Sequence, residues 1–270
     1  MLIDTHCHLD ATEFDADRDS VIAAALAQNV QMMVVPAVDR NSFSAVTALA
    51  QQNTCCVHAL GIHPMYVQDA QPEDLTLLAD LLAAQLNSNK PPVAIGEIGL
   101  DFFVQDFDKP RQEFYFNEQL KLAQQFDLPV ILHVRRSIDD ILKHLRKTKV
   151  RGGIAHAFNG SHQQAEQFIE LGFKLGFGGA LTYPRALKIR ELVTTLPLES
   201  IVLETDAPDI PPEWLKNGEK NSPHQLAKIA EIIASLRHIK HSQVAEITTN
   251  NALEILPKMA ELFTRGNVLL

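Results

Sequence analysis

The chain has 270 residues, of which 46% are hydrophobic and 21% are charged, so it can bury the core of one large globular domain, although its length alone also permits two. Its formal net charge of −9 at pH 7 argues against a protein that coats duplex nucleic acid with a broad basic face. It does not exclude a nuclease, because divalent cations and a few arginines can create one positive pocket on a negative body.

Short β-branched runs alternate with longer amphipathic segments along the whole chain. Strands are expected over residues 2–6, 31–37, 55–60, 92–97, 129–133, 153–156, 173–177 and 200–205. Helices are expected near residues 17–29, 41–53, 72–87, 110–126, 137–149, 161–170, 184–195, 223–237 and 242–263.

Eight strands that alternate with helices through short connections predict an α/β protein of the TIM (β/α)8 barrel type, with residues 1–270 as a single domain. A doubly wound open sheet is the competing fold, but the first strand is not followed by a glycine-rich phosphate loop. The longest irregular segment, 207–222, follows the eighth strand, so we expect it to form a wall of the active site.

Six side chains that can bind a metal stand where apolar runs end. They are His6, His8, Glu97, His133, His156 and Asp206. A (β/α)8 barrel builds its site at the C-terminal ends of its strands, so we expect these side chains to meet there. Imidazoles together with carboxylates suit a hydrolytic centre with one or two divalent cations.

The spacing of these residues suggests how two cations would be shared. His6 and His8 face the same way if the first strand stays extended to residue 8, because alternate side chains of a strand point to the same side. Glu97 ends an apolar strand, so its buried carboxylate needs a positive partner, and its two oxygens can bridge two cations. The predicted ligands are His6, His8, Glu97 and Asp206 for one metal and Glu97, His133 and His156 for the other.

Three further residues are expected near this centre. Glu204 shares the face of Asp206 one layer deeper, which favours a buried acid that supports the ligands over a direct ligand. His63 either contacts a substrate phosphate or caps the turn at 61–64. Arg135 closely follows His133, and its guanidinium suits a phosphate or a carboxylate.

Five sequence segments occur in the order found in one known protein family. They are 4–10 (DTHCHLD), 61–64 (GIHP), 94–101 (AIGEIGLD), 128–135 (LPVILHVR) and 204–208 (ETDAP). Together they resemble the TatD family of metal-dependent hydrolases and deoxyribonucleases, which are amidohydrolase-like barrels, from residue 2 to residue 252. The resemblance implies a TIM barrel with two divalent cations, zinc, magnesium or manganese, on the same six ligands, and places His63 and Arg135 near the substrate. The usual activity of the family is hydrolysis of DNA phosphodiesters, often from a 3′ end, while a few relatives act on other esters, including aminoacyl-tRNA.

The chain departs from the commonest family pattern beside the predicted metal site. Phe102 and Phe103 stand where tyrosine is frequent, Ala157 replaces a common cysteine, and Lys220 stands where arginine is common. These changes leave the six ligands intact, so they put in doubt the preferred substrate and not the metal site.

The function expected from the residues and the resemblance is that of a deoxyribonuclease acting on single-stranded or frayed DNA ends. Two cations would activate a water, Asp206 would take its proton as general base, and Arg135 would stabilise charge on the phosphate. Two alternatives stay open. One is a hydrolase of a small ester, lactone or amide, including an aminoacyl-tRNA ester, and the other is a barrel that binds metal without catalysis.

The expected surroundings are the cytoplasm, without membrane contact. No segment has the ~18 to 20 uninterrupted apolar residues of a membrane helix, and the first residues lack the basic start of a secretory signal. The sequence leaves the oligomeric state open, a monomer included.

Overall fold

The computed structural model describes residues 1–216 and 218–267, and in them eight parallel strands follow one another around a barrel in chain order. The strands are β1 (Leu2–Asp4), β2 (Val30–Pro36), β3 (Cys56–Leu60), β4 (Ala94–Asp101), β5 (Val130–Arg135), β6 (Gly153–Ala155), β7 (Phe173–Phe177) and β8 (Ile201–Leu203). The backbone N–H of Thr5 donates to the carbonyl of Leu203 at 2.9 Å, which joins the last strand to the first. The predicted TIM barrel is therefore confirmed.

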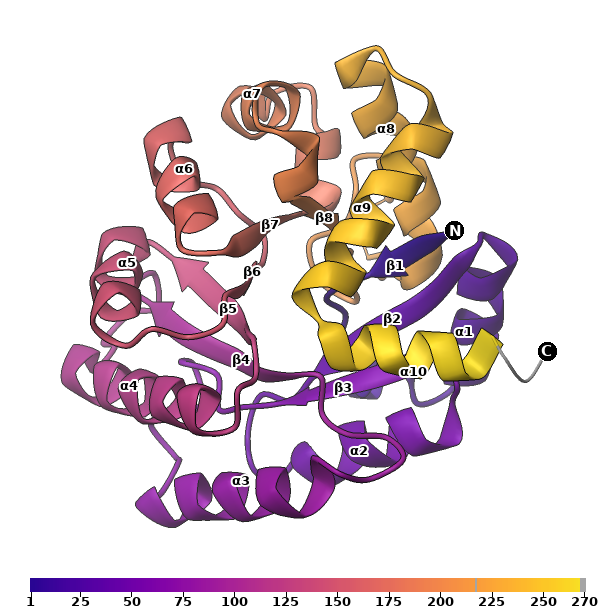
Figure 1. Ribbon diagram of the computed structural model, residues 1–270. Helices are drawn as coiled ribbons and strands as arrows, with labels where there is room; N and C mark the ends of the chain where they lie inside the picture. The colour runs from indigo at the N-terminus through magenta and orange to yellow at the C-terminus, as the bar shows by residue number, and fades with distance from the viewer. Residues whose placement is uncertain (217, 268–270) are drawn as a thin grey trace.

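Helices surround the barrel, as the ribbon in Figure 1 shows. They are α1 (Arg18–Ala27), α2 (Phe43–Gln52), α3 (Pro72–Gln85), α4 (Lys109–Gln125), α5 (Ile138–Lys147), α6 (His162–Glu170), α7 (Leu187–Thr195), α8 (Leu226–Arg237), α9 (His241–Ile255) and α10 (Pro257–Asn267), with 3-10 turns at Thr12–Phe14, Gly179–Thr182, Leu198–Ser200 and Pro223–Gln225. Within the described residues, none of these helices is long and apolar enough to cross a membrane.

Several boundaries differ from expectation. The fourth strand continues to Asp101 and does not end at residue 97, the eighth ends at Leu203, and the helix expected from residue 184 begins at Leu187. The first strand ends at Asp4 and does not stay extended to residue 8, because the carboxylate of Asp4 accepts a hydrogen bond from the backbone of His6 (3.3 Å) and turns the chain. The single helix expected over 242–263 is two helices. Leu256 leaves the helical region before Pro257, which then opens α10 at the position where proline is best tolerated.

The core has two parts. The larger one lies between the strands and the surrounding helices, and the smaller one lies inside the barrel at the N-terminal ends of the strands. There, Ala252, Leu256 and Met259 of α9 and α10 pack against Ile3 and Val57. The two helices thus cover one end of the barrel, seen from the front in Figure 1.

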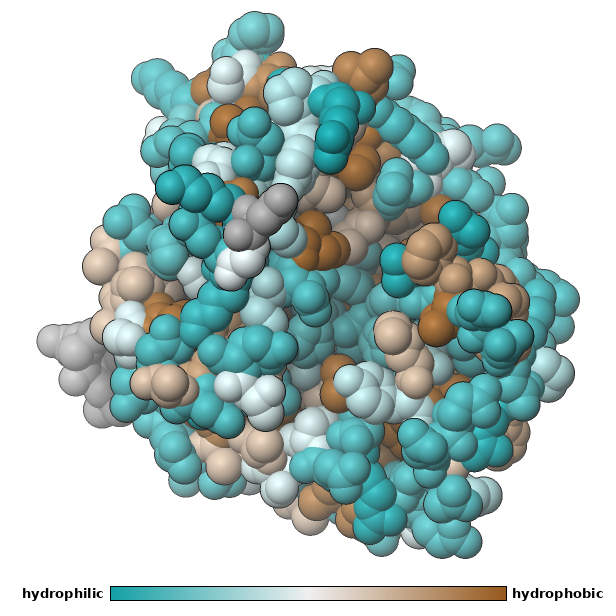
Figure 2. Space-filling model, turned by 180° about the vertical axis from the view of Figure 1, so that it is seen from behind, coloured by the Kyte–Doolittle hydropathy of each residue, from teal (hydrophilic) through white to brown (hydrophobic). Residues whose placement is uncertain are grey.

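The C-terminal ends of the strands face the other way and remain open. Figure 2 shows this opposite side, where a hollow with a hydrophilic floor lies near the centre of the face. The hollow is a cavity of about 1280 Å³, and Pro208, Asp209 and Ile210 form part of its wall. The start of the irregular segment 207–222 therefore lies where the sequence predicted.

Candidate metal centre

The strand ends bring all six predicted ligands to one place at the floor of this cavity. Glu97 lies at the middle of the group, with its side chain 2% exposed. Its Oε2 is 3.1 Å from His6 Nε2 and 3.6 Å from His8 Nε2. Its Oε1 is 2.9 Å from His133 Nδ1 and 3.0 Å from His156 Nε2. The two oxygens of one carboxylate therefore face two different pairs of imidazoles.

Asp206 completes the first of these groups. Its Oδ1 lies 3.3 Å from His6 Nε2 and 3.7 Å from His8 Nε2. Its backbone N–H donates to the carbonyl of His6 at 2.8 Å, so the link between the last and first strands fixes both residues. The side chain of Asp206 is 13% exposed, whereas that of His6 is fully buried, so Asp206 reaches further toward the cavity.

His63 lies beside the second group. Its Nε2 is 3.4 Å from Glu97 Oε1, and its Nδ1 accepts the backbone N–H of Met65 at 3.1 Å. The second contact is the turn cap that the sequence left as one alternative. The first places His63 against the predicted ligands, where the donor atoms of His63, Glu97 and His133 form one of the sets close enough to share an ion.

The donor atoms fit a divalent cation. Nε2 of His6 and Nε2 of His8 face each other at 3.3 Å, and such a pair of ring nitrogens needs a proton or a cation between them. The donor atoms of His6, His8 and Glu97 lie within 4.8 Å of one another, as do those of His6, His156 and Asp206. Metal–nitrogen and metal–oxygen bonds of roughly 2.0–2.2 Å let two ligand atoms of one ion lie up to about 4.4 Å apart. The separations of 3.1–3.6 Å among the donor atoms of His6, His8 and Glu97 are within that limit.

The charges of the centre constrain one another. Burial acts to raise the pKa of Glu97, but the neighbouring imidazoles, His156 and His6 first, outweigh it and hold the pKa well below its usual value. Burial lowers the pKa of His6 to about 3, which keeps this imidazole in the neutral form that binds cations. Burial also raises the pKa of Asp206 to about 6. Burial acts to lower the pKa of His8 and of His156, but the carboxylate of Glu97 outweighs it, and the pKa rises to about 9 for His8 and well above the usual value for His156. The centre is thus an ionised carboxylate among imidazoles, some of which carry protons that a cation would replace.

Asp101 is a residue of the centre that the sequence analysis did not single out. Its Oδ2 is 2.9 Å from His133 Nε2, and its Oδ1 accepts the backbone N–H of Phe103 at 2.8 Å. A carboxylate on the second nitrogen of a ligating histidine fixes the orientation and tautomer of the ring. Asp101 ends the strand that carries Glu97, and this position was the signal that could have identified it.

Asp4 is a second such residue. Its carboxylate accepts the backbone N–H of Thr205 at 3.0 Å and the hydroxyl of Thr205 at 2.6 Å, so it holds β8 against β1 next to His6 and Asp206. Burial raises the pKa of this carboxyl to about 8. The sequence analysis used Asp4 only as part of a motif, since its partner lies 201 positions away.

Glu204 lies behind the ligands, as expected for a supporting acid. Its Oε1 accepts the backbone N–H of Ala157 and is 3.7 Å from His156 Nδ1. Gly176 makes room for it, because a Cβ at this position would lie 2.0 Å from Glu204 Oε2. Glu204 therefore contacts His156 on the side away from Glu97.

The rim of the cavity carries Arg135 and Phe103. The guanidinium carbon of Arg135 lies 3.8 Å from the centre of the Phe103 ring, and its Nη1 is 3.8 Å from Asp101 Oδ2. Phe103 is 49% exposed and lines the cavity, whereas Phe102 stacks on Phe107 with ring centres 4.9 Å apart. Of the two phenylalanines that depart from the family pattern, Phe103 is the one at the mouth.

Comparison with known proteins gives consistent similarities. Residues 3–257 match the family model described as TatD related DNase. The chain is 41% identical to the metal-dependent hydrolase YjjV of Escherichia coli K12 over 252 residues, which cover 92% of this chain and 95% of that protein. It is 33% identical to the human deoxyribonuclease TATDN3 over 274 residues, covering 98% and 97% of the two chains. The crystal structure of YjjV superposes with a TM-score of 0.90 at 40% identity, covering 95% of this chain and 98% of that one.

Proposed function

This chain belongs to the TatD family of metal-dependent hydrolases that act on ester bonds, and from this premise we propose that it is a deoxyribonuclease that hydrolyses phosphodiesters at single-stranded DNA ends. The observation that carries the proposal is the carboxylate of Glu97, whose two oxygens lie 3.1 Å from His6 and 2.9 Å from His133. A carboxylate between two groups of imidazoles suits a site for two cations, the arrangement used in hydrolysis of phosphate esters.

In this proposal each half of the centre binds one divalent cation. The ligands are His6, His8, Glu97 and Asp206 for the first and Glu97, His133 and His156 for the second. Bound zinc, magnesium or manganese would polarise the phosphate and lower the pKa of a water from 15.7 toward roughly 7. Asp101 and Glu204 hold His133 and His156 in orientation from behind.

The protein side chains supply the remaining chemistry. Asp206 takes the proton of the attacking water as general base, since its side chain is 13% exposed in the cavity, whereas that of Glu97, which lines the same cavity, is 2% exposed. Arg135 lies on the rim of the same cavity and neutralises charge that develops on the phosphoryl oxygens. Its stacking on Phe103 restricts the guanidinium before substrate binds.

The position of the centre favours chain ends as substrate. The ligands lie at the floor of a cavity inside a barrel mouth, which the middle of a stiff double helix cannot enter. A single-stranded or frayed end can enter, and the exposed ring of Phe103 offers a surface on which a base can stack.

The proposal is tested with purified protein reconstituted with Mg²⁺, Mn²⁺ or Zn²⁺ and given single-stranded DNA, double-stranded DNA, RNA and a panel of aminoacyl and small carboxylic esters. We expect the fastest turnover on single-stranded DNA and none with Glu97→Gln. Hydrolysis of esters without hydrolysis of DNA under all three metals would replace the deoxyribonuclease by the small-ester alternative, and binding of metal without turnover of any substrate would leave the non-catalytic one.

A further inference from the structure

The cavity above the metal centre has one wall that is basic and aromatic. It is formed by Phe103, Arg135 and Arg136, at and beyond the ends of β4 and β5. The guanidinium carbons lie 3.8 Å (Arg135) and 4.5 Å (Arg136) from the centre of the phenylalanine ring. We call these three residues the basic wall.

Two carboxylates line the cavity beside the basic wall, but each has a partner. Asp140 accepts a hydrogen bond from the ammonium group of Lys109 at 2.8 Å, and Asp139 accepts the side-chain amide of Gln164 at 2.8 Å. Arg135 also lies 3.8 Å from the carboxylate of Asp101, whereas Arg136 forms no ion pair among the residues that the structure describes. Arg136 therefore keeps a positive charge available on this side of the cavity.

The other wall is acidic and aromatic. Glu13, Tyr66 and Asp209 line the cavity there, and they follow β1, β3 and β8. Since the strands close in chain order, the loops after β8 and β1, which carry Asp209 and Glu13, lie across the barrel from the loops after β4 and β5. Tyr66 follows β3, so it lies between the two acids and the β4 loop. We call these three residues the acidic wall.

Tyr66 is 44% exposed, and the two acids of this wall and two further acids, Asp10 and Asp39, act on its hydroxyl. Burial first, and then the charges of Asp39, Asp10, Asp209 and Glu13, raise the pKa of the Tyr66 hydroxyl. Four carboxylates from three different loops are therefore near enough to act on one phenol. An exposed aromatic ring with carboxylates around it suits a neutral group that has a flat face and hydroxyl donors.

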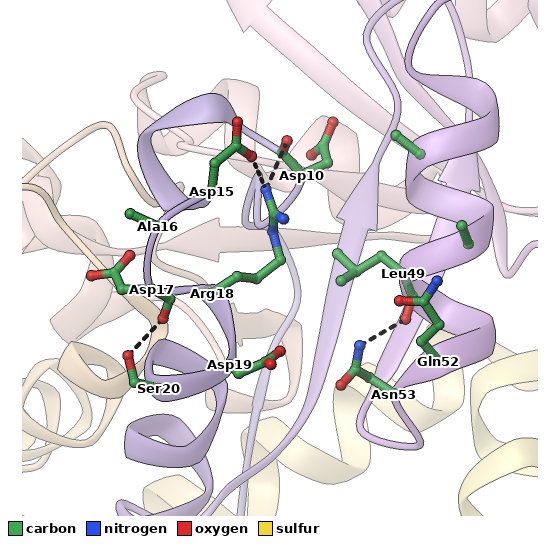
Figure 3. Close-up of a pocket in the computed structure, with 12 residues that line it drawn as sticks. Asp10, Asp15, Ala16, Asp17, Arg18, Asp19, Ser20, Leu49, Gln52 and Asn53 are labelled. Carbon is green, nitrogen blue, oxygen red and sulfur yellow. Dashed lines mark hydrogen bonds and ion pairs between the residues drawn. The ribbon is translucent and has the colours of Figure 1, made fainter.

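Positive charge near these four acids is sparse but not absent. Burial raises the pKa of Asp10, and the charges of His8 and Arg18 act against that rise. Within residues 1–216 and 218–267, none of the four acids lies within ion-pair distance of a lysine or arginine. Arg18 runs beneath Asp10, but it bonds the carboxylate of Asp15 at 2.6 Å in a second cavity between α1 and α2, as Figure 3 shows. The ammonium group of Lys220 donates to the backbone carbonyl of Glu13 and not to its carboxylate. The carboxylate that pairs with Lys220 is that of Asp17, at 2.6 Å.

We propose that the two walls are subsites for different parts of the substrate, one that favours phosphate groups and one that disfavours them. This inference rests on the proposed nuclease function. The basic wall holds the polynucleotide and its phosphates. The acidic wall receives the terminal nucleoside, whose base stacks on Tyr66 and whose single free hydroxyl donates to Glu13 or Asp209. A further phosphate on that nucleoside is rejected.

The carboxylates of the acidic wall would select chain ends that carry no phosphate. A unit charge about 8 Å from a carboxylate changes an equilibrium by roughly twofold at the dielectric constant of water and by roughly thirtyfold at the effective value of about 20 typical near a protein surface. A terminal phosphate carries nearly two charges and would meet at least two carboxylates on this wall. A phosphodiester in the middle of a chain would be cleaved slowly for the same reason. The nucleotides beyond it would bring their own phosphates against the carboxylates of the acidic wall.

The test uses one single-stranded oligonucleotide in four forms, with hydroxyls at both ends, a phosphate at the 5′ end, at the 3′ end or at both. We expect a phosphate on the end from which nucleotides are removed to lower kcat/KM of the metal-loaded protein at least about tenfold. A phosphate on the other end should have no effect. The loss of kcat/KM caused by the phosphate should become smaller as the salt concentration rises, because Glu13 and Asp209 are exposed to solvent.

The variants assign the effect to the acidic wall. In the double variant Glu13→Gln/Asp209→Asn the ratio of kcat/KM between the hydroxyl-ended and the phosphate-ended form should fall to within about threefold. The value of kcat/KM for the hydroxyl-ended form should itself fall, because its hydroxyl loses carboxylate acceptors. Glu170→Gln removes an exposed carboxylate at the end of α6, remote from the cavity lining, and should keep the full penalty. Arg136→Gln should raise KM for a ten-nucleotide chain and leave KM for a dinucleoside monophosphate unchanged.

Two results would overturn the inference in different ways. If all four forms are cleaved equally, or if the loss of kcat/KM persists in the double variant, the acidic wall does not select the chain end. Either result leaves the proposed hydrolysis of DNA unaffected. Hydrolysis of esters but of no DNA form overturns the proposed function, and the subsites fall with it.

Discussion

At the scale of single residues, Glu97 is the side chain on which the centre depends most. Its carboxylate is buried and ionised, and both of its oxygens lie within 3.1 Å of a histidine nitrogen. A buried charge in such a place is stable only with positive partners. Replacement of Glu97 therefore affects both halves of the centre, whereas replacement of His6 removes a donor mainly from one.

We predict that Glu97→Ala abolishes turnover and releases both metal equivalents. His6→Ala should mainly weaken the binding of one, because the imidazoles on the Oε1 side of Glu97 remain. Elemental analysis of the purified variants, after dialysis against the same buffer, measures the difference. If Glu97→Ala keeps two tightly bound equivalents, the carboxylate is not a bridge.

Asp206 gives a prediction that separates binding from catalysis. Asparagine can still offer an oxygen to a cation but cannot accept the proton of the water, so Asp206→Asn should lower kcat by at least about 10²-fold with KM little changed. Steady-state kinetics together with metal analysis test this. A smaller loss of kcat at unchanged metal content would count against Asp206 as the general base.

The convergence of the six side chains could be predicted because each stands at or just beyond the end of an apolar run, a pattern that is local in the chain. The roles of Asp101 and Asp4 could not be predicted in this way. Asp101 acts on His133 across two strands, and Asp4 acts on Thr205 from 201 positions away. Such roles follow from the closure of the barrel and from side-chain orientation, which no local pattern encodes.

At the scale of secondary-structure elements, order and type were predicted better than boundaries. The alternation of period-2 and period-3.6 patterns identified the strands, but side-chain hydrogen bonds and prolines decided where elements end. The carboxylate of Asp4 ended β1, and Pro257 divided the last helical segment. The division matters for the site, because α9 and α10 cover the N-terminal end of the barrel and leave the other end open.

The attachment of α9 to the barrel gives a stability prediction. Asn251 is 4% exposed, and its amide donates to the carbonyls of Leu198 (2.8 Å) and Ile201 (2.7 Å) at the start of β8. Asn251→Ala leaves both buried carbonyls without this donor, so we expect a loss of about 2–4 kcal/mol in the free energy of unfolding.

Urea denaturation of Asn251→Ala beside the exposed neighbour variant Asn250→Ala measures this loss. The Asn250→Ala protein should unfold within about 0.5 kcal/mol of the parent, as is usual for surface substitutions. Both variants should bind metal normally, since the centre lies at the other end of the barrel. Equal stability of the two variants would mean that the amide of Asn251 does not hold α9 to β8.

At the scale of the whole molecule, the net charge of −9 and the shape of the cavity limit how nucleic acid can approach. A negative body offers little long-range attraction to a polyanion. The positive charge at the mouth is confined to a few side chains, Arg135 and Arg136 among them, around a hollow whose floor is the metal centre. Under the proposed function, the binding energy for nucleic acid therefore comes from a short stretch of chain that enters this hollow.

This approach predicts a preference for free ends and a shallow dependence on salt. Linear single strands should be degraded, while covalently closed single-stranded circles of the same sequence should be cut at least about tenfold more slowly, because no end can enter past the acidic wall. Since only about two or three phosphates meet arginines, the logarithm of the binding constant should fall with the logarithm of salt concentration with a slope near −2, against roughly −10 for a protein that coats a groove. The two substrates are compared in one gel assay under Mn²⁺, and binding is measured with the Asp206→Asn protein at several salt concentrations. Equal cleavage of circles and linear strands would contradict entry by an end, and a steep salt slope would mean that nucleic acid contacts a surface far larger than the mouth of the barrel.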